Sequence, residues 1–283
     1  MLTVKDLNFR YPKSNHATLK GLNFSITKGE IFGFLGPSGA GKSTTQKILY
    51  KLLPAYTGEI LFQDKPLHQW NRDFYEQIGV SFELPNHYLK LTAEENLTFF
   101  ASFYKNPVTD VRELLAKVDL DQDRKKLVSD FSKGMKMRLN FVRSLLHNPE
   151  ILFLDEPTSG MDPINGNKIK DIIKALKHEG KTIFISTHNM FDADQLCDRV
   201  ALLHKGEIKA LDTPANLKLK HGNRTVKITT SSPGKQEFIF PLENIGQNSR
   251  FLDTLINSQI DTIHSQEATL EEVFIKITGE QLA

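Results

Sequence analysis

Short runs in which apolar and polar residues alternate, or in which apolar residues cluster, fill the first third of the chain, as expected of β-strands. These runs predict strands at residues 2–9, 22–27, 31–35, 57–62 and 78–82. Between the third and fourth runs, residues 42–53 have the pattern of a helix. The chain therefore opens with strands, and a helix follows the third of them after a short loop.

A different spacing begins near residue 91. Apolar positions recur every three or four residues over 91–104 and 108–118, which predicts helices. Thr92 and Glu95 have the spacing of a capping box at a helix N-terminus. Because Asn148-Pro149 stops the pattern, we predict an α-helical subdomain over about residues 89–147.

The remaining pattern predicts two buried strands and a separate C-terminal region. Continuous apolar runs at 151–154 and 182–186 are typical of parallel strands buried on both faces. After a predicted helix at 213–220 and a break at His221-Gly222-Asn223, strands are predicted at 226–230, 237–240 and 260–264, and helices at 247–257 and 269–278. We therefore predict an α/β fold with one domain over 1–221 and a small α+β accessory domain over 222–283.

Composition adds few constraints. The 283 residues include 36 Lys and Arg against 34 Asp and Glu, and this formal net charge of +2 neither demands nor excludes an anionic partner. Cys197 is the only cysteine, so it is predicted to be a small buried residue of a chain in a reducing cytosol. Because the start lacks a signal-peptide pattern and no stretch approaches the roughly 18 apolar residues of a membrane span, we expect a soluble chain.

The stretch after the predicted strand at 31–35 matches the phosphate-binding loop, G-x-x-x-x-G-K-[ST]. Its residues are Gly36, Pro37, Ser38, Gly39, Ala40, Gly41, Lys42, Ser43 and Thr44. The glycines let the backbone curl around an anion, and the next helix adds the positive end of its dipole. Lys42 can reach the β- and γ-phosphates, and Ser43 can hold Mg²⁺. A turn that only caps a helix is the alternative, but the strand-loop-helix context favours a nucleoside triphosphate site.

Polar residues also follow both buried strands. Asp155 and Glu156 come after the first, at the sheet edge where α/β proteins bind ligands. Asp155 is positioned to hold Mg²⁺, and Glu156 to orient or deprotonate an attacking water. His188 follows the second strand and can hydrogen-bond a γ-phosphate, although a lone histidine is more often structural. Tyr11, just past the first strand of the chain, can stack on a base or complete the packing of that strand.

Five motifs together resemble the ATP-binding-cassette (ABC) ATPase family in order and spacing. They are the phosphate-binding loop, Phe131-Ser132-Lys133-Gly134-Met135, Leu154-Asp155-Glu156-Pro157, Ser159-Gly160-Met161-Asp162 and Ser186-Thr187-His188. The resemblance covers about residues 2–219. It implies a P-loop ATPase fold with an antiparallel β subdomain and a separate helical subdomain.

In that family two cassettes pair head to tail, with ATP between the phosphate-binding loop of one and the signature motif of the other. The resemblance implies that Ser132 and Gly134 face the γ-phosphate bound to a second copy, and that Asp162 lies in a loop at the dimer interface. It also implies that Glu156 is the general base, that His188 senses the γ-phosphate, and that the cofactors are ATP and Mg²⁺.

The chain departs from the family pattern at two places. Lys133 and Met135 replace the first glycine and the glutamine of the usual Leu-Ser-Gly-Gly-Gln signature. Where a glutamine that senses magnesium and faces the membrane subunit is usual, this chain has Glu83. A carboxylate can ligate Mg²⁺, but it adds negative charge beside the γ-phosphate, so we predict that Glu83 alters hydrolysis or coupling.

The signature variant, Glu83 and the ending at residues 268–279 resemble cassettes of bacterial drug, antibiotic or lipid exporters. This resemblance implies an ATPase subunit that works as two copies with a separate membrane permease. It also implies a cytoplasmic location, peripheral on the inner face of the cell membrane, and no direct nucleic-acid binding. The transported substrate is not encoded in these motifs.

Two alternatives stay open at this point. A soluble cassette can act on nucleic acid, ribosomes or protein assembly, but such proteins commonly carry two cassettes or long coiled-coil insertions, and this sequence has neither. A nucleotide sensor that does not hydrolyse ATP is the other alternative, with Glu83 as its support. The intact Lys42, Asp155, Glu156 and His188 argue against it.

Overall fold

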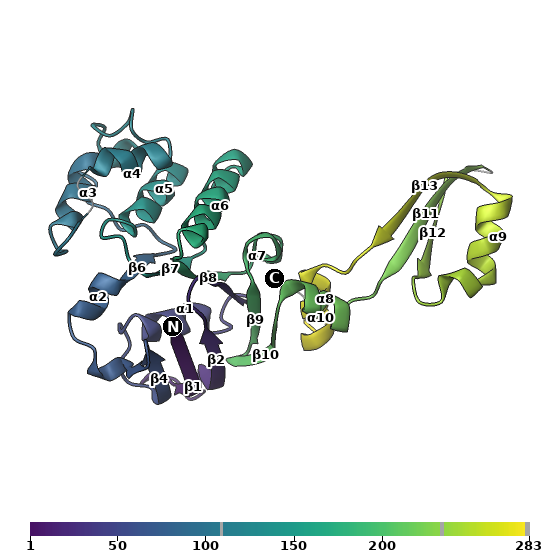
Figure 1. Cartoon of the computed structure of the whole chain (residues 1–283), viewed down its shortest axis with the longest axis horizontal. Helices are drawn as coiled ribbons and strands as arrows, with labels where there is room; N and C mark the ends of the chain where they lie inside the picture. The colour runs from purple at the N-terminus through teal and green to yellow at the C-terminus, as the bar shows by residue number, and fades with distance from the viewer. Residues whose placement is uncertain (108–109, 233–234, 281–283) are drawn as a thin grey trace. The chain divides into compact units, whose positions relative to one another are not determined.

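The computed structural model describes residues 1–107, 110–232 and 235–280 (Figure 1). Its described residues form two compact units, Met1–Leu211 and a C-terminal unit that begins at Asp212. The division falls ten residues before the boundary that the sequence predicts at 221/222, because the helix that starts at Pro214 packs against the last helix of the chain. The predicted start of a helix at 108 lies outside the described residues.

A six-stranded sheet in strand order β10-β9-β3-β8-β7-β6 forms the centre of the first unit. Its strands are β3 (Ile31–Leu35), β6 (Ile78–Ser81), β7 (Ile151–Asp155), β8 (Thr182–Thr187), β9 (Arg199–His204) and β10 (Glu207–Asp212). The pairs from β9 through β3, β8 and β7 to β6 are parallel. Every residue of β3, β7 and β8 is buried, which explains their continuous apolar sequences.

An antiparallel sheet in the order β2-β1-β4-β5 shares its core with the central sheet. Its strands are β1 (Leu2–Phe9), β2 (Leu19–Ile26), β4 (Thr57–Phe62) and β5 (Lys65–Pro66). Apolar side chains of β1 and β2 alternate inward and pack with phenylalanines of β3, including a stacked pair of Phe24 and Phe32 with ring centroids 5.6 Å apart. This sheet is the antiparallel β subdomain that the ABC resemblance implies.

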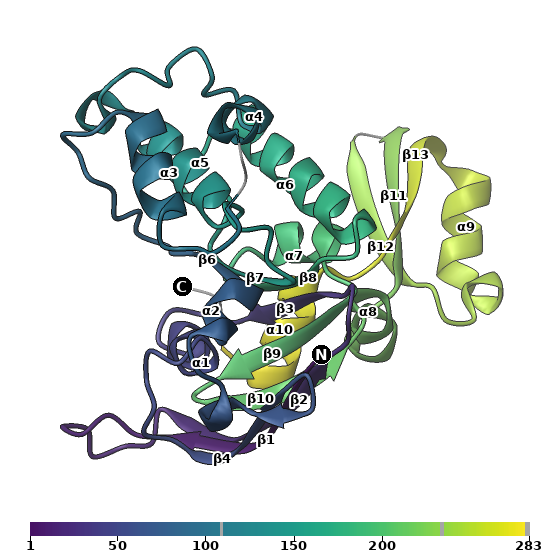
Figure 2. The same ribbon diagram turned by 60° about the vertical axis from the view of Figure 1, so that its left-hand side comes forward.

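Helices flank the central sheet of the first unit. They are α1 (Lys42–Leu49), α2 (Asp73–Gln77), α3 (Ala93–Ala101), α4 (Val111–Lys117), α5 (Lys133–Arg143), α6 (Pro163–His178) and α7 (Met190–Leu196), with short 3-10 helices η1 (Leu67–Gln69) and η2 (Val128–Asp130). Helices α3, α4 and α5 lie together on the opposite side of the central sheet from β1, β2 and β4 (Figure 1 and Figure 2). The predicted capping box of Thr92 and Glu95 opens α3.

The C-terminal unit is an α+β structure. Its elements are α8 (Pro214–His221), β11 (Thr225–Ser232), β12 (Gln236–Pro241), η3 (Ile245–Gln247), α9 (Ser249–Asn257), β13 (Gln259–Gln266) and α10 (Leu270–Thr278). The strands form an antiparallel sheet in the order β12-β11-β13 around a small core of Val226, Ile228 and Phe240. Within the described chain, no helix combines the length and apolar character that a membrane crossing requires.

The predicted α/β P-loop fold is confirmed, with differences at element ends. Helix α1 ends at Leu49 rather than at residue 53, because Tyr50 leaves helical geometry and Lys51 has a left-handed φ of 64°. Helix α6 and strands β9 and β10 are present although the sequence analysis did not predict them, and α7 ends at Leu196, just before Cys197. These elements complete the sheet around the two buried strands.

Candidate active site

The phosphate-binding loop joins the end of β3 to the start of α1, as predicted. A Cβ atom on Gly36 would lie 2.2 Å from the carbonyl oxygen of Leu203, and Gly41 has φ +111°. Only glycine is tolerated at positions with such a close approach or such a φ angle. No side chain among the described residues caps α1, so the backbone N–H groups of its first turn stay available to an anion.

Lys42 is folded against this loop. Its ammonium donates to the carbonyl oxygens of Gly36 at 2.6 Å and Pro37 at 3.1 Å, and the residue is only 8% exposed. Burial lowers the pKa of Lys42, while the nearby carboxylates of Glu156, Asp155 and Glu83 oppose that shift. The lysine is therefore a buried cation whose counter-charges lie across the same site.

Asp155 and Glu156 stand at the carboxyl end of β7, and both are buried. Burial raises the pKa of Asp155, the charges of Glu83 and Glu156 raise it further, and hydrogen bonds from Ser186 and Ser43 oppose the rise. Glu156 has a left-handed φ of 49°, which is uncommon for a residue other than glycine. Strained backbone of this kind is found at functional sites, where surrounding contacts hold it.

Three hydrogen bonds hold the carboxylate of Glu156. Thr187 Oγ1 donates to Oε2 at 2.8 Å, and the backbone N–H of His188 donates to Oε1 at 2.9 Å. His188 Nδ1 also lies 2.7 Å from Oε1, while the histidine side chain is 57% exposed. The predicted base and the predicted phosphate sensor therefore touch each other, and the imidazole is partly exposed to solvent.

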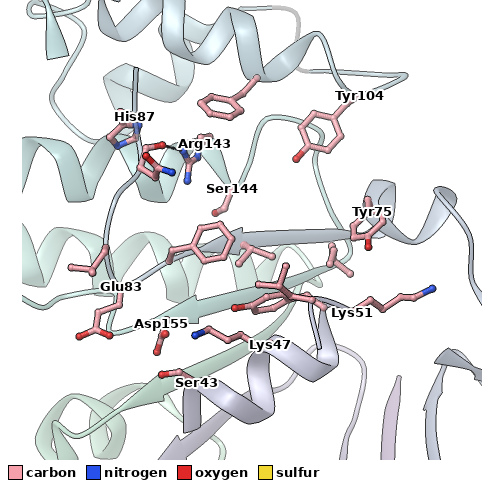
Figure 3. A pocket seen from close by; sticks show the side chains of 18 of the residues that line it. Ser43, Lys47, Lys51, Tyr75, Glu83, His87, Tyr104, Arg143, Ser144 and Asp155 are labelled. Atoms are coloured by element: carbon pink, nitrogen blue, oxygen red, sulfur yellow. Dashed lines mark hydrogen bonds between the residues drawn. The ribbon is translucent and has the colours of Figure 1, made fainter. Parts of the chain in front are cut away.

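The three residues predicted to hold a metal line one crevice of about 900 Å³. Figure 3 shows Ser43, Asp155 and Glu83 gathered at one end of it. A hydroxyl and two carboxylates suit Mg²⁺, which usually takes one or two carboxylates and completes its shell with water and substrate phosphates. Within the described part of the chain, no group of three or more His, Cys, Asp or Glu is arranged to hold a metal ion by itself.

The residues predicted to contact a second copy lie at exposed helix starts. Ser132 is the N-cap of α5, where its hydroxyl accepts from the N–H of Met135 at 3.2 Å. Asp162 is the N-cap of α6 and accepts from the N–H groups of Ile164 and Asn165 at 3.1 and 3.0 Å. A Cβ on Gly134 would have no heavy atom nearer than 4.0 Å, so its surface is open.

Helix α5 is tied to the segment that contains Glu83. The fully buried Asn140 donates to Ser81 Oγ at 3.1 Å and to the carbonyl oxygen of Phe82 at 2.7 Å. Arg143 donates to Asn140 Oδ1 at 2.7 Å. These contacts connect the metal end of the crevice to the helix that begins at Ser132.

Tyr11 lies beside the phosphate-binding loop. Its hydroxyl is 3.2 Å from Thr44 Oγ1, and its ring packs edge-on against Phe9 with centroids 4.8 Å apart. The ring is 36% exposed, so one part of it packs on β1 and another part stays accessible. Both predicted roles, base stacking and strand packing, are compatible with this position.

Four polar residues of this site were not assigned roles from the sequence. They are Gln46, Asn140, Ser186 and Thr187, and all are buried. Ser186 and Thr187 belong to a motif in which only His188 was given a function. Gln46 and Asn140 could have been found as polar residues on the buried faces of helices, where apolar residues are expected.

The arrangement is that of a P-loop ATPase, in which the predicted residues Ser132 and Asp162 lie at exposed helix starts. The sequence matches the family model of ABC transporters over residues 19–159 and that of the fluoroquinolone efflux ABC transporter C-terminal domain over 224–267. The chain belongs to the ABC transporter family.

Relatives and solved structures agree with this assignment. A fluoroquinolones export ATP-binding protein of Mycobacterium tuberculosis is 51% identical over all of this chain and 94% of its own length. The bacitracin transport ATP-binding protein of Bacillus licheniformis is 34% identical over 99% of this chain and 97% of its own length. A dimeric ATP-binding cassette bound to ADP and Pi superposes with a TM-score of 0.69 at 28% identity, covering 75% of this chain and 98% of the other. The predicted ATPase subunit of the drug-exporter branch is thereby confirmed.

Proposed function

We propose that two copies of this chain close around two Mg·ATP molecules and use hydrolysis to drive a separate membrane permease that exports fluoroquinolone-type drugs. The observation that carries the proposal is the convergence of Lys42, Ser43, Asp155 and Glu156 at one edge of the sheet, in a chain similar over its whole length to drug-export ATPases. The C-terminal match to a fluoroquinolone efflux domain supports the substrate class.

Each site residue has a distinct role in this proposal. Lys42 and the loop Gly36–Gly41 bind the β- and γ-phosphates, while Ser43, Asp155 and Glu83 hold Mg²⁺, which neutralises phosphate charge when bound. Glu156 takes the proton of the attacking water, and His188 contacts the γ-phosphate. Tyr11 contacts the base.

Ser132 and Asp162 are exposed at helix starts, so in this proposal they complete the nucleotide site of a second copy. Ser132 and the start of α5 would offer a hydroxyl and a helix dipole to the γ-phosphate bound by the other copy, with Gly134 allowing close approach. Asp162 would lie at the interface between copies. The complex would sit on the cytoplasmic face of the membrane through the permease.

The first test is Mg²⁺-dependent ATP hydrolysis by the purified chain across a range of protein concentrations. A dimeric engine predicts activity that rises more than proportionally with concentration, because the active species contains two chains. Strict proportionality at all concentrations would contradict the shared site.

The transport proposal is tested in cells. Affinity purification of the tagged chain from solubilised membranes should recover an integral-membrane protein, and deletion of the chain's gene should raise fluoroquinolone accumulation. Recovery of RNA or ribosomes instead would favour the soluble alternative. If a permease were recovered but fluoroquinolone accumulation did not change, the chain would still be a transporter ATPase, and fluoroquinolones would not be its substrate class.

A further inference from the structure

Gln46 is a polar side chain on the buried face of α1, two hydrogen bonds away from Asp155 of the proposed metal site. It is fully buried, as is Ser186 at the end of β8. Gln46 Nε2 lies 2.9 Å from Ser186 Oγ and 3.4 Å from the carbonyl oxygen of Leu154. Since a carbonyl can only accept, it fixes the amide nitrogen on this side, and Ser186 Oγ receives a hydrogen bond from Gln46.

The hydroxyl of Ser186 then has its own proton to give. Ser186 Oγ donates to Asp155 Oδ1. The two residues are neighbours in the register of the parallel pair β7 and β8, which places their side chains on the same face. A chain of donors therefore runs from Gln46 through Ser186 to the carboxylate of Asp155.

The direction of this chain matters because a hydroxyl can rotate. Without a donor at its lone pairs, Ser186 could turn its proton to another acceptor. With Gln46 donating to Ser186 Oγ, the hydroxyl proton of Ser186 is directed to Asp155 Oδ1, which accepts it. Loss of a group that orients a metal ligand typically lowers metal affinity or activity about 10- to 100-fold.

Gln46 makes these contacts at a cost. Its Oε1 is buried and has no hydrogen-bond partner among the described residues. A buried amide oxygen without a donor destabilises the folded chain. A residue kept only for packing would be better as an apolar side chain, which points to a role in the site.

We propose that Gln46 and Ser186 are positioning residues that hold the carboxylate of Asp155 in the orientation that binds Mg²⁺. The proposal rests on the proposed function of this site as a Mg·ATP site. The variants that test it are Gln46→Met, which keeps side-chain length but removes both amide hydrogen bonds, and Ser186→Ala. Thr45→Val is the matched control, because Thr45 is a fully buried neighbour on α1 whose hydroxyl donates to the carbonyl oxygen of Gly41 at 3.0 Å.

The measurement is the binding of fluorescently labelled ADP to the full chain during a Mg²⁺ titration, repeated in EDTA, together with the melting temperature. The Mg²⁺ concentration at half-saturation should rise about tenfold in Ser186→Ala and about three- to tenfold in Gln46→Met, as for loss of groups that orient metal ligands. Affinity in EDTA should not change. The melting temperature of Gln46→Met should be equal or higher, because the orphan oxygen is gone.

A double variant tests whether Gln46 acts on Asp155 through Ser186 or independently of it; the first case is called the relay. If Gln46 acts through Ser186, the variant with both substitutions should match Ser186→Ala alone. Half-saturation within twofold of the unaltered chain in Gln46→Met, or additive effects in the double variant, would overturn the relay. If the unaltered chain bound ADP without any Mg²⁺ dependence, the proposed metal site itself would fail, which is a separate result.

Discussion

The residues assigned to the nucleotide fall into two sets that differ in burial. Lys42, Asp155 and Glu156 form a buried set, each less than 10% exposed and held by hydrogen bonds from its own chain. Ser132 and Asp162 form an exposed set, at the starts of helices whose side-chain caps are already satisfied.

The difference indicates which part of the site one chain completes alone. The buried set is arranged before nucleotide binds, so its electrostatic effect needs little reorganisation. The exposed set makes only capping contacts within the described chain. The buried set should therefore govern binding and chemistry in each copy, and the exposed set should act only when two copies meet.

Among the substitutions that test this comparison, Glu156→Gln should have the largest effect on turnover. Removal of a general base typically lowers turnover about 10²- to 10⁴-fold, while ATP binding persists because Lys42 and the phosphate-binding loop are unchanged. Hydrolysis assays and size-exclusion chromatography with ATP should show an inactive, stable dimer. Glu150→Gln is the control, because Glu150 directly precedes the first residue of β7, at the opposite end of the strand from Glu156. It should keep normal turnover. Normal hydrolysis by Glu156→Gln would mean that another residue activates the water.

Ser132→Asp tests the exposed set without loss of the helix cap, since aspartate caps helices as well as serine does. The added charge should face the opposite γ-phosphate and lower turnover about tenfold or more, because like-charge contacts cost several kcal/mol. ATP binding by the monomer and the melting temperature should stay close to those of the unaltered chain. Asn248→Asp adds the same charge at the N-cap of α9 and serves as the control. Equal loss of monomer binding would break the distinction between the sets.

Glu83→Gln should have a smaller effect, because Glu83 is exposed and shares the metal end with Asp155 and Ser43. Its charge raises the pKa of Asp155, so neutral glutamine should change turnover or Mg²⁺ half-saturation by about three- to tenfold. Steady-state hydrolysis against Mg²⁺ concentration measures both, with Glu59→Gln on β4 as the control. If neither value moved, Glu83 would have no part in the site.

Acid should weaken a contact between the segment that follows Glu83 and helix α5, which begins just after Ser132. This contact should have little effect on turnover at neutral pH. His87 Nε2 donates at 3.0 Å to the carbonyl oxygen of Lys136 on α5. Burial lowers the pKa of His87 to about 4; the hydrogen bond to Lys136 opposes this shift, and the charges of Arg143 and Lys136 add to it. His87 takes up a proton near pH 6.5 in the unfolded chain but only near pH 4 in the folded chain. Stability is therefore lost as the pH falls through that window, by on the order of 3 kcal/mol.

Thermal melts of His87→Gln between pH 4 and 7 check this prediction. Glutamine keeps a donor for the Lys136 carbonyl but does not titrate, so the melting temperature should depend less on pH than in the unaltered chain. His68→Gln in η1 is the control, because it removes a histidine from outside this contact. An identical pH dependence in His87→Gln and the unaltered chain would assign the acid sensitivity to other groups.

Much of the buried set could be predicted from local sequence. The phosphate-binding loop, Asp155 and Glu156 follow strands whose continuous apolar runs are unambiguous, and the glycine positions depend on backbone geometry close to them in the chain. The end of α1 at Leu49 was harder to predict, because it depends on the left-handed turn at Lys51 rather than on hydrophobic periodicity.

The sequence by itself determined the ABC family and the strand-loop-helix of the phosphate-binding loop, and it pointed to Lys42, Asp155 and Glu156 as candidate site residues, since each motif consists of residues adjacent in the chain. The tertiary structure decided that Gln46 and Ser186 support Asp155, that Thr187 and His188 hold Glu156, and that Asn140 joins α5 to the Glu83 segment. These partners are distant in sequence. Their contacts arise only when the register of β7 and β8 and the packing of α1 and α5 bring buried polar groups within hydrogen-bond distance.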